Sequence, residues 1–284
     1  MEQGFVKVAS ATPRIRVADP VYNAQVICEQ AKEAAEHGAK IVVFPELCIT
    51  GYTCNDLFLQ ELLLEKAKEA LLTIAEETGQ LETLFLVGLP VDKDGRLYNV
   101  AAVLYRGRIL GMIPKKNIPM YAEFYEGRHF TPGEETVTEY RLGKQVIPFG
   151  SNLLFRCEEL PELILGCELC EDLWVAEPPS TSHALMGATV IANLSASNET
   201  VSKDDYRTLL IKASSARLLC GYIYTSAGEG ESTQDLVFGG HDLIAENGTL
   251  LVQSARFTTG ILYTDLDVLK ISSERRRMGT FGKR

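Results

Sequence analysis

The 284-residue sequence lacks any long uninterrupted apolar run. A membrane-spanning helix needs roughly 18 or more consecutive apolar residues, and no segment approaches that length. Residues 1–7 also lack the charged segment and apolar core of a secretory signal. We therefore expect a cytoplasmic protein that does not bind membranes.

Basic side chains are in deficit, with 28 Lys and Arg against 38 Asp and Glu and a formal net charge of -10. Nucleic-acid phosphates require clustered Lys and Arg. The one basic run, residues 275–277, is typical of a solvated helix end or linker. We expect no nucleic-acid partner and a small-molecule substrate.

Cysteine and histidine are too few and too scattered for a disulfide framework or a metal site. Seven cysteines, an odd number spread over a large chain, fit a reducing compartment. Cys167 and Cys170 form the one Cys-x-x-Cys pair, the four histidines lie far apart, and a closed zinc site needs four ligands. We expect no metal.

Apolar residues are plentiful at 46%, enough to bury a large core, and the length permits one large α/β domain. Residues 5–10 alternate like a strand, Asp19 and Pro20 open a helix that stops at Gly38, and residues 41–44 form the next strand. Further helices are expected at 60–78, 182–186 and 205–219, and further strands at 83–88, 153–155, 162–166, 189–192, 222–224 and 260–264. Hairpins are expected at 98–115, turning at 106–108, and at 243–252 around Asn247-Gly248. Residues 121–150 read as a long ordered loop.

Three reactive side chains follow predicted strands. Glu46 follows the strand at 41–44, Lys115 follows the second arm of the first hairpin, and Cys170 follows the apolar run at 163–169. Ligands bind outside the carboxyl ends of strands in open α/β sheets, so these residues are expected to converge. Amide hydrolysis needs a thiolate, a base and an oxyanion-stabilising cation or N–H pair. Cys170 is therefore a candidate nucleophile, although a lone cysteine is usually a small buried apolar residue.

Several segments carry a resemblance to a known family. Three of them resemble the signature boxes of the nitrilase superfamily of carbon–nitrogen hydrolases: Phe44-Pro-Glu46-Leu-Cys-Ile-Thr-Gly51-Tyr52, Pro114-Lys115 and Cys170-Glu171-Asp172. More narrowly, residues 114–126, 147–155 and 168–174 resemble the N-terminal glutaminase domain of glutamine-dependent NAD synthetase. Residues 193–197 and 239–244 agree with that subfamily, and the resemblance runs nearly end to end.

The resemblance implies an α-β-β-α sandwich of two mixed sheets. It assigns residues 1–270 to the carbon–nitrogen hydrolase (glutaminase) domain and 271–284 to a tail or the start of a linker to an absent synthetase domain. It makes Glu46 the general base and acid, Lys115 rather than Lys116 the oxyanion cation, and Cys170 the nucleophile. The Glu171 backbone N–H is the second oxyanion donor, and Glu126 orients the lysine.

The resemblance also implies a set of substrate-binding residues: Tyr121, Glu171, Ser197 and Lys203. They would hold the α-amino and α-carboxylate groups of glutamine or shape the pocket. Without the family, a loop tyrosine is as often packing, a serine after a strand is commonly a cap, and a lone lysine is usually solvated. Before Lys203 the chain has Val-Ser where the family usually has glycine. This departure from the family pattern concerns the expected contact of Lys203 with the α-carboxylate of glutamine.

The implied reaction releases ammonia and glutamate from glutamine through a cysteine thioester. The glutaminase step needs no cofactor. The ammonia would serve ATP-dependent amidation of deamido-NAD in the absent synthetase domain, which alone would use ATP and magnesium; the sequence has no Ser-Gly-Gly pyrophosphatase loop. A homo-oligomer is expected. The alternatives are a stand-alone amidase acting on another ω-amide or carbamoyl compound, and a non-catalytic scaffold, against which the Glu-Lys-Cys set argues.

Overall fold

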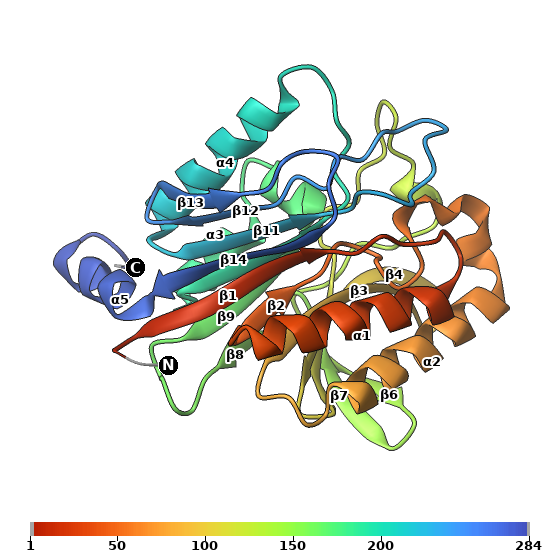
Figure 1. The fold of residues 1–284 in the computed structure, drawn as a ribbon, viewed down its shortest axis with the longest axis horizontal. Coiled ribbons are helices and arrows are strands. Elements are labelled where there is room, and N and C mark those ends of the chain that lie inside the picture. The colour runs from red at the N-terminus through yellow and green to blue at the C-terminus, as the bar shows by residue number, and fades with distance from the viewer. Residues whose placement is uncertain (1–2, 283–284) are drawn as a thin grey trace.

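A computed structural model describes residues 3–282 as two β-sheets packed face to face between outer helices (Figure 1). Both sheets contain parallel and antiparallel neighbours, so the expected α-β-β-α sandwich of two mixed sheets is confirmed. Residues 283 and 284, the end of the expected tail, lie outside the described residues. None of the described helices combines the length and the apolar character that a bilayer crossing needs.

The first sheet has eight strands and contributes two of the predicted site residues. In spatial order its strands are β14 (Gly260–Asp267), β1 (Phe5–Thr12), β2 (Ile41–Val43), β3 (Leu84–Lys93), β4 (Arg96–Tyr105), β5 (Arg108–Pro114), β7 (Gln145–Phe149) and β6 (Thr138–Leu142). The chain leaves β2 just before Glu46 and leaves β5 directly at Lys115.

The second sheet has six strands: β13 (Thr249–Gln253), β12 (Leu243–Glu246), β11 (Gly221–Ser226), β10 (Val190–Ser195), β9 (Ile164–Leu169) and β8 (Leu154–Arg156). Its three central strands, β9, β10 and β11, run parallel. Their carboxyl ends therefore share one edge of the sheet, where Cys170 follows β9 and Ser197 follows β10.

Helices α1 (Pro20–Glu36) and α2 (Glu61–Glu77) cover the first sheet, whereas α3 (Pro179–Leu185) and α4 (Lys203–Leu218) cover the second (Figure 1). The start of α1 is as predicted: Asp19 Oδ1 accepts the backbone N–H of Tyr22 at 3.1 Å, and Pro20 occupies the first turn. Short 3₁₀ helices follow three of the site segments, at Tyr52–Leu59, Glu126–Arg128 and Cys170–Leu173.

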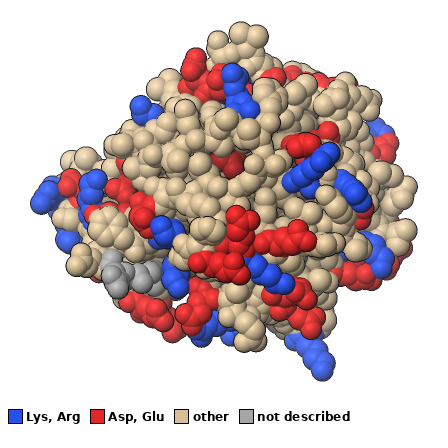
Figure 2. Space-filling view, viewed as in Figure 1, with Lys and Arg blue, Asp and Glu red and all other residues tan. Residues whose placement is uncertain are grey.

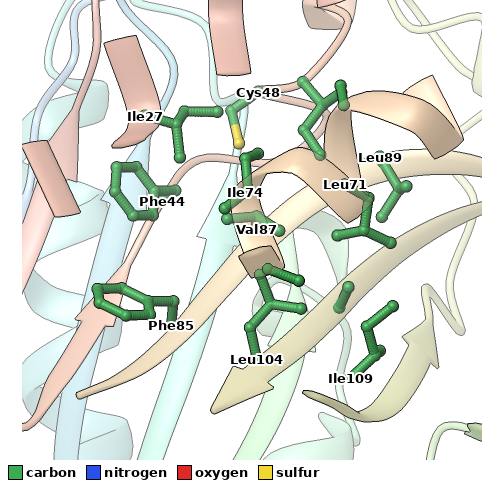
Figure 3. Close-up of a cluster of buried hydrophobic side chains, with 14 of the residues drawn as sticks. Ile27, Phe44, Cys48, Leu71, Ile74, Phe85, Val87, Leu89, Leu104 and Ile109 are labelled. Atoms are coloured by element: carbon green, nitrogen blue, oxygen red, sulfur yellow. The ribbon is translucent and has the colours of Figure 1, made fainter. Parts of the chain in front are cut away.

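Each pair of adjacent layers encloses its own apolar cluster. Figure 3 shows the cluster between the first sheet and its helices, where Ile27 of α1 and Leu71 and Ile74 of α2 pack over Phe85 and Leu104. A second cluster lies between the two sheets and joins residues such as Val43, Ile113, Leu169, Leu194 and Ile223. Fully burying one such side chain stabilises the fold by about 1.5–3 kcal/mol, so the sheets are held firmly at the depth where the site lies.

The expected loop at 121–150 is wrong in its second half, which forms the β6–β7 hairpin turning at Gly143. The buried residues Tyr140, Leu142, Ile147 and Phe149 alternate with exposed ones. Gly143 has φ +57°, in the region that favours glycine. In β7 the exposed residues Val146 and Pro148 are apolar, which obscured the period-two pattern in the sequence.

The expected solvated run at 275–277 is wrong for Arg275. This residue belongs to α5 (Val268–Arg277), and its guanidinium donates to the carbonyls of Ala188 at 2.6 Å and of Leu218 and Leu219 at 2.9 Å. Two of these carbonyls lie at the end of α4, where the helix dipole favours a cation. Arg275 therefore ties α5 to the second sheet layer.

Candidate active site

The predicted reactive residues come from both sheets and meet between them. Glu46 and Lys115 extend from the first sheet, whereas Cys170 extends from β9 of the second. The backbone N–H of Glu46 donates to the Ser195 carbonyl at the end of β10, at 3.3 Å. The convergence therefore follows from the packing of the sheets.

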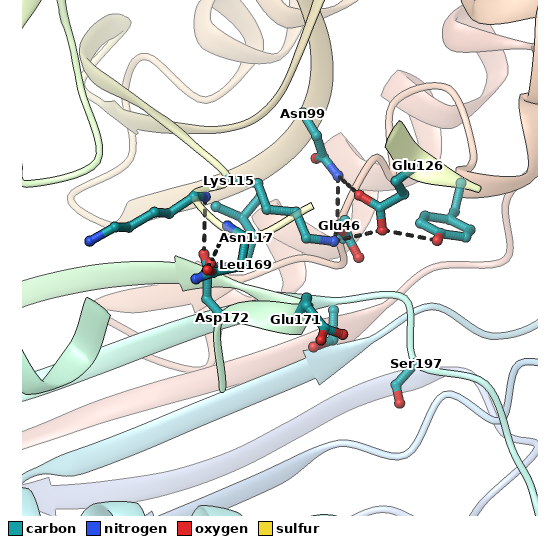
Figure 4. A network of polar contacts seen from close by, with 12 residues as sticks. Glu46, Asn99, Lys115, Asn117, Glu126, Leu169, Glu171, Asp172 and Ser197 are labelled. Atoms are coloured by element: carbon teal, nitrogen blue, oxygen red, sulfur yellow. Dashed lines mark hydrogen bonds and ion pairs between the residues drawn. The ribbon is translucent and has the colours of Figure 1, made fainter. Parts of the chain in front are cut away.

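Lys115 lies in a buried cluster with two carboxylates (Figure 4). Its Nζ is 2.7 Å from Glu46 Oε1 and 2.6 Å from Glu126 Oε1. The side chains of Lys115 and Glu46 are fully buried and that of Glu126 is 5% exposed. The Tyr52 hydroxyl donates to Glu126 at 2.9 Å, and the Asn99 amide donates to Glu46 at 2.7 Å and Glu126 at 3.4 Å. Hydrogen bonds thus compensate the burial of three charges.

The electrostatic balance of this cluster keeps the lysine charged. Burial alone would lower the pKa of Lys115, but Glu126, Glu46 and Cys170 outweigh it, and the pKa lies well above its usual value. Burial raises the pKa of Glu126 to about 7, with a further increase from Glu46, while Lys115 opposes the rise. One cation therefore faces two carboxylates, and burial makes Glu126 a weaker acid than usual by raising its pKa.

Cys170 has a strained backbone at the junction of β9 and the following 3₁₀ turn. Its φ of +39° lies in the left-handed region, which costs a non-glycine residue on the order of 1–2 kcal/mol. Burial raises the pKa of its thiol, Glu46 and Glu126 raise it further, and Lys115 opposes them. The thiol therefore needs a base to take its proton during attack, and Glu46, whose charge acts on the thiol more strongly than that of Glu126, is the candidate.

Asp172 fastens the cysteine turn to the lysine segment (Figure 4). Its carboxylate accepts the backbone N–H of Leu169 at 3.0 Å, and both the backbone N–H and the side-chain amide of Asn117 at 2.8 Å. Neighbouring Lys116 instead pairs with the exposed Glu135, and its own side chain is 38% exposed. Of the two adjacent lysines, the structure brings Lys115 alone into the buried cluster.

Cys170 also lines a hollow of about 420 Å³ that contains all four predicted substrate-binding residues, Tyr121, Glu171, Ser197 and Lys203. The Tyr121 hydroxyl donates to the two Glu171 carboxylate oxygens at 2.9 and 3.0 Å. The hollow therefore places a carboxylate and an ammonium on its walls beside the thiol.

Lys203 stands at the start of α4 between two aromatic rings. Its Nζ is 5.2 Å from the ring centre of Trp174 and 5.6 Å from that of Phe124, and it donates to Asn198 Oδ1. The preceding Ser202 has φ +63°, a conformation that favours glycine. Serine thus adopts the left-handed turn in this chain, and Lys203 still lines the hollow.

Sequence reasoning missed two buried residues at the site, Asn99 and Arg207. Asn99 could have been found from the sequence, because the predicted hairpin pairs Val100 with Pro114 and so sets Asn99 beside Lys115. Arg207 is fully buried and donates to Glu199 at 2.8 Å, His241 Nδ1 at 2.9 Å and the Asn198 carbonyl at 3.2 Å. Its position in α4 gives no sign of these distant partners.

Within residues 3–282, no group of three or more His, Cys, Asp or Glu side chains is arranged to hold a metal ion. On the face shown in Figure 2, basic side chains are interspersed with acidic ones.

The carbon-nitrogen hydrolase family profile matches residues 7–276. This chain belongs to the carbon-nitrogen hydrolase family. Among curated relatives, the glutamine-dependent NAD(+) synthetase of Mycobacterium tuberculosis is 43% identical over 282 residues, 99% of this chain and 42% of the relative. The enzyme of the same name from Aquifex aeolicus is 30% identical over 273 residues, 94% of this chain and 44% of the relative. The chain thus spans less than half the length of these family members.

Two solved structures share the fold. The glutamine-dependent NAD(+) synthetase from Cytophaga hutchinsonii superposes with a TM-score of 0.83 and 28% identity, covering 92% of this chain and 43% of that one. An amidase from Nesterenkonia sp. AN1 gives a TM-score of 0.76 at 20% identity, covering 98% of this chain and 96% of that one. At that identity, the amidase shows the fold alone.

Proposed function

We propose that this chain hydrolyses the side-chain amide of glutamine and provides the ammonia for a synthetase domain. One observation carries the proposal: a thiol, Cys170, opens into a hollow walled by Glu171 and Lys203, against the buried Glu46-Lys115-Glu126 cluster. The relatives named glutamine-dependent NAD(+) synthetase support the choice of substrate.

The walls of the hollow suit the charged end of a free amino acid. Glu171, held by Tyr121, receives the α-ammonium group, while Lys203 and Ser197 receive the α-carboxylate. Opposite charges at separate positions fix the orientation of a zwitterion, so that its side-chain amide reaches the thiol. A simple amide lacks both anchoring groups and gains none of this binding.

The proposed reaction has two half-reactions, and the same buried groups serve both. Cys170 Sγ bonds to the amide carbon while its proton passes to Glu46, and Lys115 with the Glu171 backbone N–H stabilises the oxyanion. Glu46 returns the proton to nitrogen as the carbon–nitrogen bond breaks, which releases ammonia and leaves a γ-glutamyl thioester. Water then attacks the thioester, with Glu46 as base, and glutamate leaves with the thiol restored. No cofactor takes part, and Glu126 holds Lys115 in place.

The partner in this proposal is the synthetase domain of the longer relatives, which would use ATP and magnesium to amidate deamido-NAD. The loop from Tyr121 to Gly133 couples the two activities, because it joins the Lys115 segment to Glu126 and carries one wall of the hollow. Adding the synthetase domain with its ligands is expected to raise glutamine turnover. High turnover in this chain alone, unchanged by the partner, contradicts the coupling.

We also propose that the chain forms a homo-oligomer, as the family resemblance implies. Light scattering at micromolar concentration checks it, and a monomeric mass contradicts it.

An amide panel with ammonia and glutamate readouts tests the proposed substrate. Glutamine is expected to exceed glutaramide, which lacks both α groups, by at least about 10²-fold in kcat/KM, as two lost charged contacts imply. Cys170→Ala is expected to abolish turnover while the fold is retained. Equal turnover of simple amides or carbamoyl compounds favours the stand-alone amidase.

A further inference from the structure

Asn99 on β4 contacts both carboxylates of the buried cluster through its side chain and the Lys115 backbone through its own carbonyl. Its side chain is fully buried, and Nδ2 donates to Glu46 Oε1 at 2.7 Å and to Glu126 Oε2 at 3.4 Å (Figure 4). Its backbone carbonyl accepts the N–H of Lys115 at 2.8 Å. The orientation of the amide is dictated by charge, since two carboxylates accept and only the NH₂ end can donate.

The two oxygens of Glu46 are not equivalent. Oε1 accepts Lys115 Nζ and Asn99 Nδ2, both at 2.7 Å. Oε2 is buried and has no hydrogen-bond partner among the described residues. A proton added to Oε1 would displace one of two strong donors, whereas a proton on Oε2 displaces nothing.

We propose that Asn99 is a positioning residue that, with Lys115, saturates Oε1 of Glu46 and so leaves Oε2 to take the proton of Cys170. The inference rests on the proposed function only in making Glu46 the base. The Asn99 NH₂ group also donates to both Glu46 and Glu126, two carboxylates that share a single cation and otherwise repel each other.

Loss of the Asn99 donor has two expected consequences. Glu46 becomes free to rotate its oxygens, so proton transfer from Cys170 slows. The ionised carboxylates also lose a donor, so the acid limb of the pH–rate profile moves to higher pH. The charged or titratable groups that face this position are Glu46, Glu126, Lys115, Tyr52 and Cys170.

The test follows alkylation of Cys170 by iodoacetamide as a function of pH, read peptide by peptide by mass spectrometry. This reagent reports on the thiol and its base whatever the natural substrate. The variants are Asn99→Leu, which removes the donor, and Asn99→Asp, which replaces it by a third acid of the same shape. The matched control is Asn193→Leu, a fully buried asparagine of β10 whose amide donates to the Tyr222 hydroxyl at 3.2 Å.

Asn99→Leu is expected to lower the plateau rate about 10–100-fold, the value of one hydrogen bond to a charged group, and to move the acid limb up by about one pH unit. Asn99→Asp is expected to move the limb further, and Asn193→Leu to leave the limb in place. The inference is overturned if the acid limb of the pH–rate profile stays at its wild-type position in both Asn99 variants. It is also overturned if Asn193→Leu shifts the acid limb equally. Glutamine turnover of the wild type is scored separately, so the proposed function can fail while this result stands.

Discussion

Lys115 and Arg207 are both fully buried cations, yet they serve different ends. Lys115 is surrounded by side-chain carboxylates, one of which keeps an oxygen without a partner in the described chain. Arg207 spreads its donors over Glu199, His241 and the Asn198 carbonyl, and its Nη2 also lies 3.4 Å from Ser197 Oγ.

A carboxylate oxygen beside each cation lacks a hydrogen-bond partner among the described residues: Oε2 of Glu46 near Lys115 and Oε2 of Glu199 near Arg207. The difference lies in the groups that surround these oxygens. Around Lys115, Oε2 of Glu46 is the oxygen that we propose to take the proton of Cys170. Around Arg207, the bonded groups are walls: Ser197 and Asn198 are held where the first lines the hollow and the second contacts Lys203. Burial of a charge alone does not mark catalysis; the unused acceptor beside a nucleophile does.

Replacing Arg207 tests the structural half of the comparison, in which this residue supports the wall of the hollow. Arg207→Met leaves Glu199 buried without its main partner and should lower the free energy of unfolding by about 3–5 kcal/mol, measured by urea titration. Where folded enzyme remains, KM for glutamine should rise more than kcat falls, because Ser197 loses its support. Arg128→Met, which removes an exposed pair with Asp56, is the control and should cost no more than about 1 kcal/mol. Equal losses in the two variants contradict a structural role for Arg207.

Replacing Lys115 tests the other half of the comparison, the proposed catalytic cluster. Lys115→Met removes the proposed oxyanion cation and is expected to lower kcat about 10²–10³-fold, measured by ammonia release from glutamine. Lys116→Met removes only an exposed pair with Glu135 and should keep most activity. The reverse order of the two variants contradicts the assignment.

A buried carboxyl group, Asp242, sharpens the comparison with a smaller effect. Burial raises the pKa of Asp242 to about 7, so the folded protein binds a proton that the unfolded chain releases near pH 4. Its stabilising contribution is complete below pH 4 and is lost as pH rises towards 7, at up to about 1.4 kcal/mol per pH unit. Asp242→Asn preserves the bonds to Thr12 and the Ser226 N–H. Relative to that of the wild type, its free energy of unfolding should therefore rise by up to about 2 kcal/mol between pH 5 and pH 7. Urea unfolding at each pH checks this. A free energy of unfolding that changes with pH equally in the wild type and in Asp242→Asn contradicts it.

Local pattern was enough to predict the strand ends that present Glu46, Lys115 and Cys170, because each follows a clear apolar run. The hairpin between β3 and β4 was missed although its Asp94-Gly95 turn is a strong signal. The packing of one sheet on the other depends on contacts distant in sequence, and it entered only through the family resemblance. The partners of Arg207 and Arg275 are equally remote, since no local period encodes a bond across 34 or 87 residues.

The most direct measurement is mass spectrometry of the Cys170 peptide from wild-type chain, acid-quenched during glutamine turnover. The account predicts one γ-glutamyl group on Cys170, absent from Cys170→Ala and released by added hydroxylamine. Glutamine consumption with unmodified Cys170 at every quench time, together with turnover in Cys170→Ala, would contradict it.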